Sequence, residues 1–492
     1  MSGKKVTIIG AGISSLSAAS FLGKAGYEVT ILEKNETIGG RGRQFSAEGF
    51  VFDMGPSWYW MPEVFENFYQ KFGYTTSDFY ELKRLDPSYN VFWKDGTKTG
   101  IPASIDQLYD WFETQEKGSA PKLKKFLADA QYKYEVGMND LVFQPSLKYT
   151  EFADMRILKG LFKLQLLSSF SKYIRKYFKN EKILSLLEFP ILFLGAMPKD
   201  TPALYSLMNY ADISLGTWYP MGGMYHFIAA FEKIAKENGV KILTNHEVTG
   251  IKKEGKNVTH VSTIHGDIET DILISGADYQ HTDEKILEKD ANYSNEYWDK
   301  RTMAPSSLLF YLGINKKLEG LEHHNLFFDE DFEQHASEIY QNPTWPSAPL
   351  FYASVPSITD KSVAPEGCEN LFLLVPIAPD LKDDEATRER YFELLMSRLE
   401  AKTGQKIKEH IIYKRSFCLD DFKKDYHAFK GNAYGLANTL KQTAIFKPSL
   451  KSKKLKNMFY TGQLTVPGPG VPPSIISGEV VAKQVMKEFG IK

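Results

Sequence analysis

Two glycines and one acidic residue near the start of the chain have the types and spacing that bind a dinucleotide. Gly10 and Gly12 directly follow an apolar run, residues 5–9, and Glu33 ends a second apolar run, residues 27–32. Gly10 allows a tight turn, and Gly12 lets the backbone approach a pyrophosphate, which the free N–H groups and dipole of the following helix attract. Glu33 lies 21 residues beyond Gly12, close to the roughly 20 expected for the acid that binds the ribose hydroxyls. The order of strand, glycine turn, helix, strand and acid therefore predicts a dinucleotide site.

Two serines occupy the start of the expected helix. Ser14 follows the glycine turn, and Ser15 takes the place of the third glycine of the dinucleotide fingerprint. Close packing of the helix on the strand must therefore accommodate one hydroxymethyl group. An ordinary strand-to-helix turn is the alternative interpretation, and the flanking strands with their correctly placed acid argue against it.

A basic loop with paired glycines, residues 39–43, follows Glu33 and indicates a flavin rather than a nicotinamide cofactor. The glycine pair lets the chain cross close to a cofactor, and Arg41 can pair with the pyrophosphate as a planar, permanently charged donor. A solvated basic surface loop is the alternative.

The composition is typical of a large soluble enzyme. The 492 residues provide roughly two to three domains of chain, and the formal net charge of −1 gives no indication of a nucleic-acid partner. Cys368 and Cys418 are too few for a disulfide framework and are not spaced for a metal, so we expect a reducing, cytoplasmic compartment. We find no secretion signal and no run of about 20 apolar residues, so we expect no membrane-spanning helix.

Three later segments are typical of strands that return to the nucleotide-binding domain, which would make that domain discontinuous. Residues 241–248 follow a helical stretch, and residues 271–278 form another apolar run with a turn behind it. Residues 458–462 form a last strand that leads into the proline- and glycine-rich residues 463–473 and a small-residue helix start. A second helix N-terminus would then point at a bound group. A plain proline–glycine turn is the alternative.

Residues 156–182 combine positive charge with apolar residues at helical spacing. This stretch has eight lysines and arginines against the single Glu181. Such a helix can lie in an anionic lipid headgroup layer with its apolar side inserted. A basic face over the protein's own core is the alternative.

The chain resembles, over nearly its whole length, the FAD-dependent carotenoid desaturases of the bacterial phytoene desaturase type, within the amine-oxidase-like flavoproteins. Beside the N-terminal fingerprint, the matching motifs are residues 39–41, 52–57, 218–224, 310–313, 321–325, 354–360, 420–422, 431–436 and the terminal Gly-Pro segment. Val466 stands where the family's closing signature usually has histidine, and Pro473 where it has its final glycine. These departures indicate a specialised branch.

The resemblance implies that separate parts of the chain hold the nucleotide half of FAD. These residues are Gly10, Gly12, Ser14, Ser15 and Arg41 at the pyrophosphate, Glu33 at the adenosine ribose, and Val248 at the adenine through its backbone. Asp278 stands where the family often has asparagine and is expected at the nucleotide.

The resemblance also places residues around the flavin half. Gly55, Pro56 and Ser57 would lie beside the isoalloxazine. Gly462 would pass near the ribityl chain, and Gly470 and Val471 would present backbone N–H groups to the flavin N1–C2=O end, where negative charge develops on reduction.

The fold that the resemblance implies is α/β, with a discontinuous Rossmann-type FAD-binding domain, a mixed sheet and helix substrate domain, and a helical membrane-facing part. The expected boundaries are 1–104, 216–300 and 446–492 for the FAD-binding domain, 105–215 for the helical part and 301–445 for the substrate domain. Aromatic residues make up 14% of the chain, and we expect a group of them to line an apolar tunnel for a polyene. A carotenoid is almost insoluble in water, so we expect peripheral attachment at the inner face of the membrane.

The activity that the resemblance implies is the dehydrogenation of a carotenoid C–C bond, in which hydride leaves for flavin N5 and the neighbouring proton is lost. Through Val466 and the Trp58-Tyr59 stretch, the chain is most similar to desaturases that add a 3,4 double bond to 1-hydroxylated acyclic or monocyclic carotenoids. A multi-step phytoene desaturase, a flavin-dependent carotene isomerase and a prenyl-lipid carrier without a redox role stay open.

No catalytic residue, electron acceptor or oligomeric state is assigned from the sequence. It contains no nucleophile elbow, no zinc-type histidine motif and no P-loop. His323 and His324 are adjacent, and neighbouring strand residues point to opposite faces, so we expect no metal there.

Overall fold

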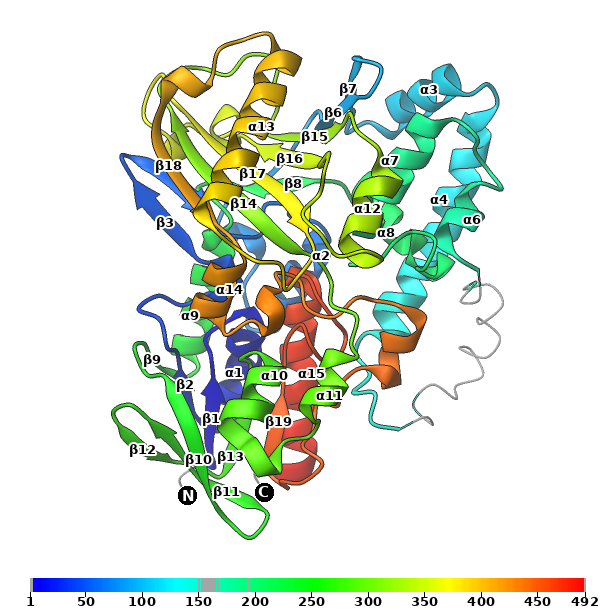
Figure 1. Cartoon of the computed structure of the whole chain (residues 1–492). Coiled ribbons are helices and arrows are strands. Elements are labelled where there is room, and N and C mark those ends of the chain that lie inside the picture. The colour runs from blue at the N-terminus through cyan, green and yellow to red at the C-terminus, as the bar shows by residue number, and fades with distance from the viewer. Residues whose placement is uncertain (1–2, 149–150, 152–164, 166–167, 193–194, 491–492) are drawn as a thin grey trace.

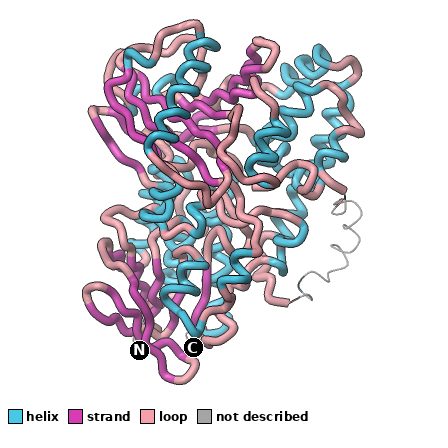
Figure 2. Tube along the Cα trace, in the orientation of Figure 1, coloured by secondary structure: helices cyan, strands magenta, loops and turns pink. Residues whose placement is uncertain are grey.

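The fold is that of a computed structural model. It describes residues 3–490, apart from 149–150, 152–164, 166–167 and 193–194. Segments from the start, middle and end of the chain lie side by side in the lower half of Figure 1, in blue, green and red. The upper half holds a large sheet, with a group of helices beside it (Figure 2).

The lower half is built on a five-stranded parallel sheet with the order β19-β13-β1-β2-β9. Its strands are β1 (Lys5–Ile9), β2 (Glu28–Leu32), β9 (Lys241–Leu243), β13 (Ile272–Ser275) and β19 (Met458–Tyr460). Ile8 and Ile274 are fully buried, as expected for parallel strands that are covered on both faces. The strand order reverses at β1, which places the nucleotide crevice at the carboxyl end of that strand. The prediction of a discontinuous Rossmann-type domain is confirmed.

Three helices pack with this sheet. α1 (Ile13–Lys24) contacts both α9 (Tyr225–Glu237) and α15 (Val471–Phe489). Gly478 of α15 permits a close approach to α1, because a Cβ at that position would lie 2.3 Å from the Ser14 carbonyl oxygen. An antiparallel sheet beside this domain consists of β10 (Val248–Glu254), β11 (Asn257–Thr263) and β12 (Gly266–Glu269).

The upper half contains a seven-stranded sheet with the order β18-β14-β17-β16-β15-β6-β7. Its strands are β6 (Tyr89–Trp93), β7 (Lys98–Ile101), β14 (Ser306–Ile314), β15 (His324–Phe328), β16 (Phe351–Ser354), β17 (Glu369–Ile377) and β18 (Ile411–Phe417). One face packs on α13 (Glu385–Thr403) through Phe310 and other buried side chains. The opposite face, which we call the inner face, carries Tyr311, His324 and Tyr352.

The placement of β6 and β7 corrects the expected boundary at residue 104. That boundary assigns both strands to the FAD-binding domain, but β6 pairs in parallel with β15 and β7 pairs with β6. All of Tyr89–Trp93 is buried, because this short run is covered on both faces within the larger sheet.

The helical part contains α3 (Ile105–Gln115), α4 (Ser119–Val136), α6 (Phe170–Ile174), α7 (Glu181–Leu192) and α8 (Leu207–Asn209). Of the basic segment at 156–182, residues 156–164 and 166–167 lie outside the described residues. In the described remainder, Phe170, Tyr173 and Ile174 are buried in the protein's own core. Lys172, Lys176 and the other cations of this stretch are exposed or half-buried.

The remaining elements connect these parts. They are α2 (Pro62–Gln70), α10 (Tyr279–His281), α11 (Asn295–Asp299), α12 (Phe332–Tyr340), α14 (Leu419–Tyr426), β3 (Gln44–Ala47), β4 (Phe50–Asp53), β5 (Leu82–Arg84) and β8 (Trp218–Pro220). Within the residues described above, no helix is both long enough and apolar enough to cross a membrane.

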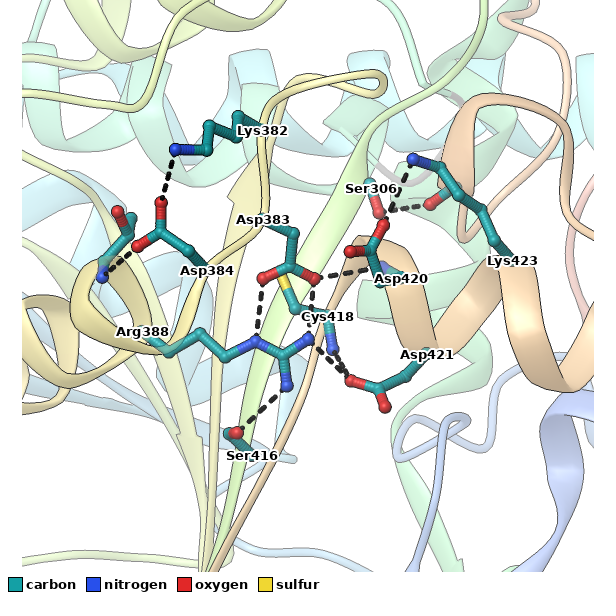
Figure 3. A network of polar contacts seen from close by, with 12 residues as sticks. Ser306, Lys382, Asp383, Asp384, Arg388, Ser416, Cys418, Asp420, Asp421 and Lys423 are labelled. Atoms are coloured by element: carbon teal, nitrogen blue, oxygen red, sulfur yellow. Dashed lines mark hydrogen bonds and ion pairs between the residues drawn. The ribbon is translucent and has the colours of Figure 1, made fainter.

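An ion-pair network fixes the start of α14 against α13 (Figure 3). The Arg388 guanidinium donates to both oxygens of Asp383, at 2.8 and 2.6 Å, and lies 2.8 Å from Asp421. Asp421 in turn accepts the backbone N–H of Cys418 at 2.9 Å and caps α14. The network therefore holds the helix whose last residue, Tyr426, lies against the side chains of Arg41 and Arg43.

Candidate cofactor and substrate site

The glycine turn after β1 has the geometry that a dinucleotide requires. Gly10 has a positive φ of 84°, and its N–H donates to the Leu32 carbonyl at 2.7 Å. Gly12 precedes α1, and a Cβ built on it would meet no described atom within 4 Å. The helix start has no side-chain cap and no acidic residue. Its first N–H groups therefore face open space that suits an anion.

Ser15, in the third-glycine position, is accommodated by a glycine on the neighbouring strand. A Cβ on Gly276, just after β13, would lie 2.0 Å from Ser15 Oγ. Because Gly276 has no side chain, it leaves room for the Ser15 hydroxymethyl group, and the helix can pack on the strand without a glycine at position 15. Ser15 Oγ is buried without a described hydrogen-bond partner.

Glu33 is buried at the carboxyl end of β2 and is 4% exposed. One carboxylate oxygen accepts the Ala11 N–H at 2.7 Å, and the other accepts the backbone and side-chain N–H groups of Asn35, both at 2.9 Å. A carboxylate has about four acceptor positions, so capacity for a ribose hydroxyl is left. The His246 N–H donates to the Glu33 carbonyl at 2.8 Å, which brings the adenine-side segment with Val248 next to this strand.

The loop at residues 39–43 crosses the glycine turn. The Gly39 N–H donates to the Ala11 carbonyl at 2.8 Å, and a Cβ on Gly40 would lie 3.3 Å from Gly12 Cα. Arg41 donates to the Asn432 carbonyl at 3.1 Å and lies 5.1 Å from the Tyr426 ring centroid. Its Nε has no hydrogen-bond partner in the described part of the chain. A donor is thereby left for an anion beside the turn.

Asp278 is engaged as a helix cap. Its carboxylate accepts the N–H groups of Gln280 at 3.0 Å and His281 at 3.3 Å, and that of Phe429 at 3.2 Å. One oxygen accepts the first two N–H groups and the other accepts the third, and the expected contact of Asp278 with the nucleotide stays a prediction. These bonds fix the loop after β13 and join it to Phe429.

The C-terminal segment packs Gly462 against the start of α1 and then begins a second helix without a side-chain cap. Gly462, just after β19, has a positive φ of 109°, and a Cβ on it would lie 3.3 Å from Ser14 Oγ. Gly470 has a φ of 117° and precedes α15, which has no side-chain cap. Pro472 and Pro473 have no N–H, so the free donors at this helix start reduce to Gly470 and Val471. These are the two residues that the resemblance assigns to the flavin.

A buried lysine lies beside this glycine loop and was missed by the sequence analysis. Lys447 is 5% exposed, and its ammonium donates to Asn438 Oδ1 at 2.9 Å. A Cβ on Gly468 would lie 3.0 Å from Lys447 Nζ. Burial lowers the pKa of Lys447 to about 7. The sequence around Lys447 contains no motif that predicts its burial, because the burial depends on contacts with another loop.

Residues 55–57 connect the cofactor side to the seven-stranded sheet. A Cβ on Gly55 would lie 2.4 Å from the Arg41 carbonyl oxygen, so only glycine fits this crossing. The Tyr311 hydroxyl donates to the Met54 carbonyl at 2.7 Å and ties the loop to β14. Ser57 lines a cavity of about 30 Å³ together with Asp53, Tyr219, His323 and Ser354.

Aromatic rings cover the inner face of the sheet next to this loop. The Trp58 ring stacks on His324 at 4.1 Å between centroids, and it lies 5.4 Å from Phe189 of α7. Phe189 in turn contacts Tyr89 at 5.7 Å and Phe328 at 5.9 Å. Such a cluster agrees with the expectation that a group of aromatic residues lines a polyene tunnel. The tunnel itself stays a prediction.

Burial shifts the pKa values of three groups near the loop. The pKa of Asp53 is raised to about 6, although the N–H groups of Met224 and Tyr225 donate to its carboxylate at 2.7 and 3.2 Å. The pKa of His323 is lowered to about 3, and that of His324 is lowered well below its ordinary value. Both imidazoles are therefore neutral at physiological pH. Among the described side chains no group of three metal-ligating residues is assembled.

These observations together fit a bound FAD. Two uncapped helix starts, the open side of Gly12 and the Arg41 Nε without a described partner provide free donors and space on the two helices and the loop that pack around the glycine turn. The donor set suits a pyrophosphate and an electron-rich ring edge.

Comparisons with known proteins agree with this reading. The family model for flavin-containing amine oxidoreductases matches residues 13–486. The chain is 39% identical to a carotenoid 3,4-desaturase of Haloarcula japonica over 492 residues, which cover 99% of each protein. It is 32% identical to a 4,4'-diapophytoene desaturase (4,4'-diaponeurosporene-forming) of Staphylococcus aureus over 499 residues, again with 99% of each covered.

Solved structures share the fold at low identity. An oxidoreductase from Methanosarcina mazei superposes with a TM-score of 0.64 at 17% identity, with 97% of this chain and 100% of that chain covered. Putrescine oxidase bound to putrescine superposes with a TM-score of 0.63 at 12% identity and 99% coverage of both chains. The amine-oxidase-like fold is thereby confirmed.

Proposed function

The chain belongs to the flavin-containing amine oxidoreductases and, within them, to the carotenoid desaturase family, and on that basis we propose that it is a carotenoid 3,4-desaturase. It is an FAD-dependent oxidoreductase that acts on carbon–carbon bonds. The proposed substrate is a 1-hydroxylated acyclic or monocyclic carotenoid. The observation that carries the proposal is the 39% identity over the full length to a carotenoid 3,4-desaturase.

Bound FAD would accept the hydride that leaves the carotenoid. The chain's contribution is to hold and orient both partners. Arg41 and the start of α1 would hold the pyrophosphate. The N–H groups of Gly470 and Val471 would face the pyrimidine edge, where negative charge develops, and Lys447 would add positive charge near that loop when protonated.

The aromatic cluster on the inner face would serve the polyene. Trp58 and Phe189 are large apolar rings next to the residue 55–57 loop. Their faces attract the positive charge that spreads along a conjugated chain when hydride leaves. They also exclude water from the reacting bond. No side chain is assigned as the proton acceptor.

We further propose that the protein collects its substrate at the inner face of the membrane. The carotenoid is insoluble in water, and Lys172, Lys176 and Lys179 are exposed at and just after α6, where the neighbouring Arg175 pairs with Glu188. Lysines near an anionic membrane surface each contribute about 1 kcal/mol to attachment. The support is electrostatic, since the apolar side chains of the described part face the core.

The proposal is tested with FAD-loaded protein in liposomes that contain one carotenoid each. 1-Hydroxy-γ-carotene, γ-carotene and phytoene are incubated separately, and products are separated by chromatography with absorbance spectra and mass. We expect the hydroxylated substrate to lose two hydrogens and to lengthen its conjugated system by one double bond. Conversion of phytoene alone would replace the proposal by a phytoene desaturase, and a product of unchanged mass would replace it by an isomerase. FAD-free protein is the control.

A further inference from the structure

Two buried polar atoms on the inner face of the seven-stranded sheet make no well-aligned hydrogen bond with the described residues, although the Tyr352 hydroxyl lies close to one of them, Ser354 Oγ. They are His324 Nε2 and Ser354 Oγ. His324 is 0% exposed and Ser354 is 1% exposed, and the two residues are directly opposed in the ladder between β15 and β16. Directly opposed residues project from the same face, with Cβ atoms about 5 Å apart. Buried polar atoms in folded proteins nearly always have partners, so this pair marks a place for a polar ligand group.

The His324 ring is held so that Nε2 stays in its position. Its Nδ1 lies 2.6 Å from the Tyr352 hydroxyl, and its ring stacks on Trp58 with an interplanar angle of 15°. The ring of His323 lies on a third side of His324, with 4.4 Å between the two ring centroids. In a neutral imidazole, Nε2 is a donor or an acceptor according to whether Tyr352 donates to Nδ1 or accepts from it. A hydroxyl group can bind either form.

The space beside Ser354 is small and admits only a small polar group. Ser354 and Ser57 line the cavity of about 30 Å³ described above. A single water requires roughly 10–15 Å³ measured in this way. Asp53, His323 and Asn370 also line this cavity, and His324 does not. The surroundings of His324 itself are aromatic, because Trp58 stacks on it and Tyr352 lies 5.5 Å from Trp58 between ring centroids. The fitting ligand is an apolar molecule that ends in one small uncharged polar group.

The place of this pair relative to the cofactor matters for the reaction. Gly55 contacts Arg41, Ser57 lines the cavity, and Trp58 stacks on His324. One short loop therefore runs from the pyrophosphate side to the unpartnered imidazole nitrogen. In a 1-hydroxylated carotenoid, only C2 separates the carbon that carries the hydroxyl from the C3–C4 bond. A group that anchors the hydroxyl next to this loop would place that bond beside the flavin.

We propose that His324 Nε2, together with Ser354 Oγ, binds the terminal hydroxyl group of the carotenoid and so determines both the preference for hydroxylated substrates and the bond that is desaturated. The inference rests on the proposed function, because it takes the substrate to be 1-hydroxylated. Tyr352 acts as a positioning residue that fixes the tautomer and orientation of His324.

The test compares the parent with His324→Phe, which keeps an aromatic ring against Trp58 and removes the nitrogen. Two readouts are measured on the FAD-loaded protein. The first is kcat/KM for 1-hydroxy-γ-carotene and for γ-carotene, and the second is the Kd of each carotenoid from quenching of tryptophan fluorescence. We expect the variant to lose about tenfold to a hundredfold of the preference for the hydroxylated carotenoid, with γ-carotene little affected. Ser354→Ala and Tyr352→Phe should lose part of the preference and serve if the first variant does not fold.

His335→Phe is the matched control, since His335 is a buried histidine of α12 whose two ring nitrogens are both hydrogen-bonded. An unchanged preference in the soluble His324 and Ser354 variants would overturn the inference and leave the desaturase proposal intact. A parent that desaturates only γ-carotene would overturn the substrate proposal. The Kd values then decide the inference alone: equal binding of both carotenoids by the parent refutes it, and tighter binding of the hydroxylated one that is lost in His324→Phe supports it.

Discussion

Replacing Glu33 with glutamine should weaken FAD binding by an amount that the structure allows us to estimate. The two carboxylate oxygens already accept three N–H groups, from Ala11 and Asn35. An amide has one oxygen and two N–H donors, so one of its ends must face a donor that the carboxylate satisfied. The ribose hydroxyl would also lose a charged acceptor, and a hydrogen bond to a charged group is worth about 1.5–3 kcal/mol. We expect the Kd of FAD to rise about tenfold to a hundredfold.

The assay is titration of FAD-free protein with FAD, followed by calorimetry or flavin fluorescence. Glu28→Gln is the matched control, because Glu28 begins the same strand and is exposed. Its Kd should equal that of the parent. If both Glu33→Gln and Glu28→Gln bind FAD with the Kd of the parent, the assignment of the ribose site to the end of β2 is refuted.

Three further predictions concern separate parts of the molecule. Gly470→Val should slow reduction of bound flavin by substrate, because a branched side chain at a φ of 117° displaces the donors at the start of α15; stopped-flow reduction at parental speed would contradict this. Lys447→Met should stabilise the FAD-free protein, and most strongly below pH 7. Burial lowers the pKa of Lys447 to about 7, so its charge destabilises the fold fully below that pH, and this effect disappears only as the pH rises toward the unfolded pKa near 10.4. A gain in melting temperature that is independent of pH would refute the assignment of Lys447 as a buried lysine with a lowered pKa. Joint replacement of Lys172 and Lys176 by glutamate should reduce sedimentation with anionic liposomes and leave the FAD content unchanged. The same replacement of the exposed Lys382 should change neither the sedimentation nor the FAD content. Equal sedimentation of all variants would remove α6 from the membrane proposal.

The parts of the fold that follow from local backbone rules could be predicted from the sequence. Gly10 and Gly12 are required by a turn of positive φ and a close approach, and Glu33 lies at a fixed spacing along one βαβ unit. These constraints act within a few dozen residues, so the residue types reveal them. The return of later strands to the same sheet could be inferred because parallel strands, buried on both faces, are short apolar runs.

The parts that depend on distant contacts could not be predicted. The apolar run Tyr89–Trp93 would suit any buried strand, so its residue types do not identify its partner. It pairs in parallel with β15, whose residues lie more than two hundred positions later in the chain. The accommodation of Ser15 by Gly276 is equally non-local. In the sequence, His324 stands out only as half of an adjacent histidine pair. Its unpartnered nitrogen becomes visible only when β16 brings Ser354 opposite and the loop after Gly55 lays Trp58 on the ring.

The central claim is tested most directly by mixing the FAD-loaded protein with 1-hydroxy-γ-carotene under anaerobic conditions and recording the flavin absorbance together with the carotenoid spectrum. We predict that the flavin bleaches while the carotenoid absorbance shifts to longer wavelength, in a ratio of one new double bond for each flavin reduced. γ-Carotene should bleach the flavin far more slowly. A flavin that stays oxidised with every carotenoid supplied would contradict the account of this protein as a carotenoid desaturase.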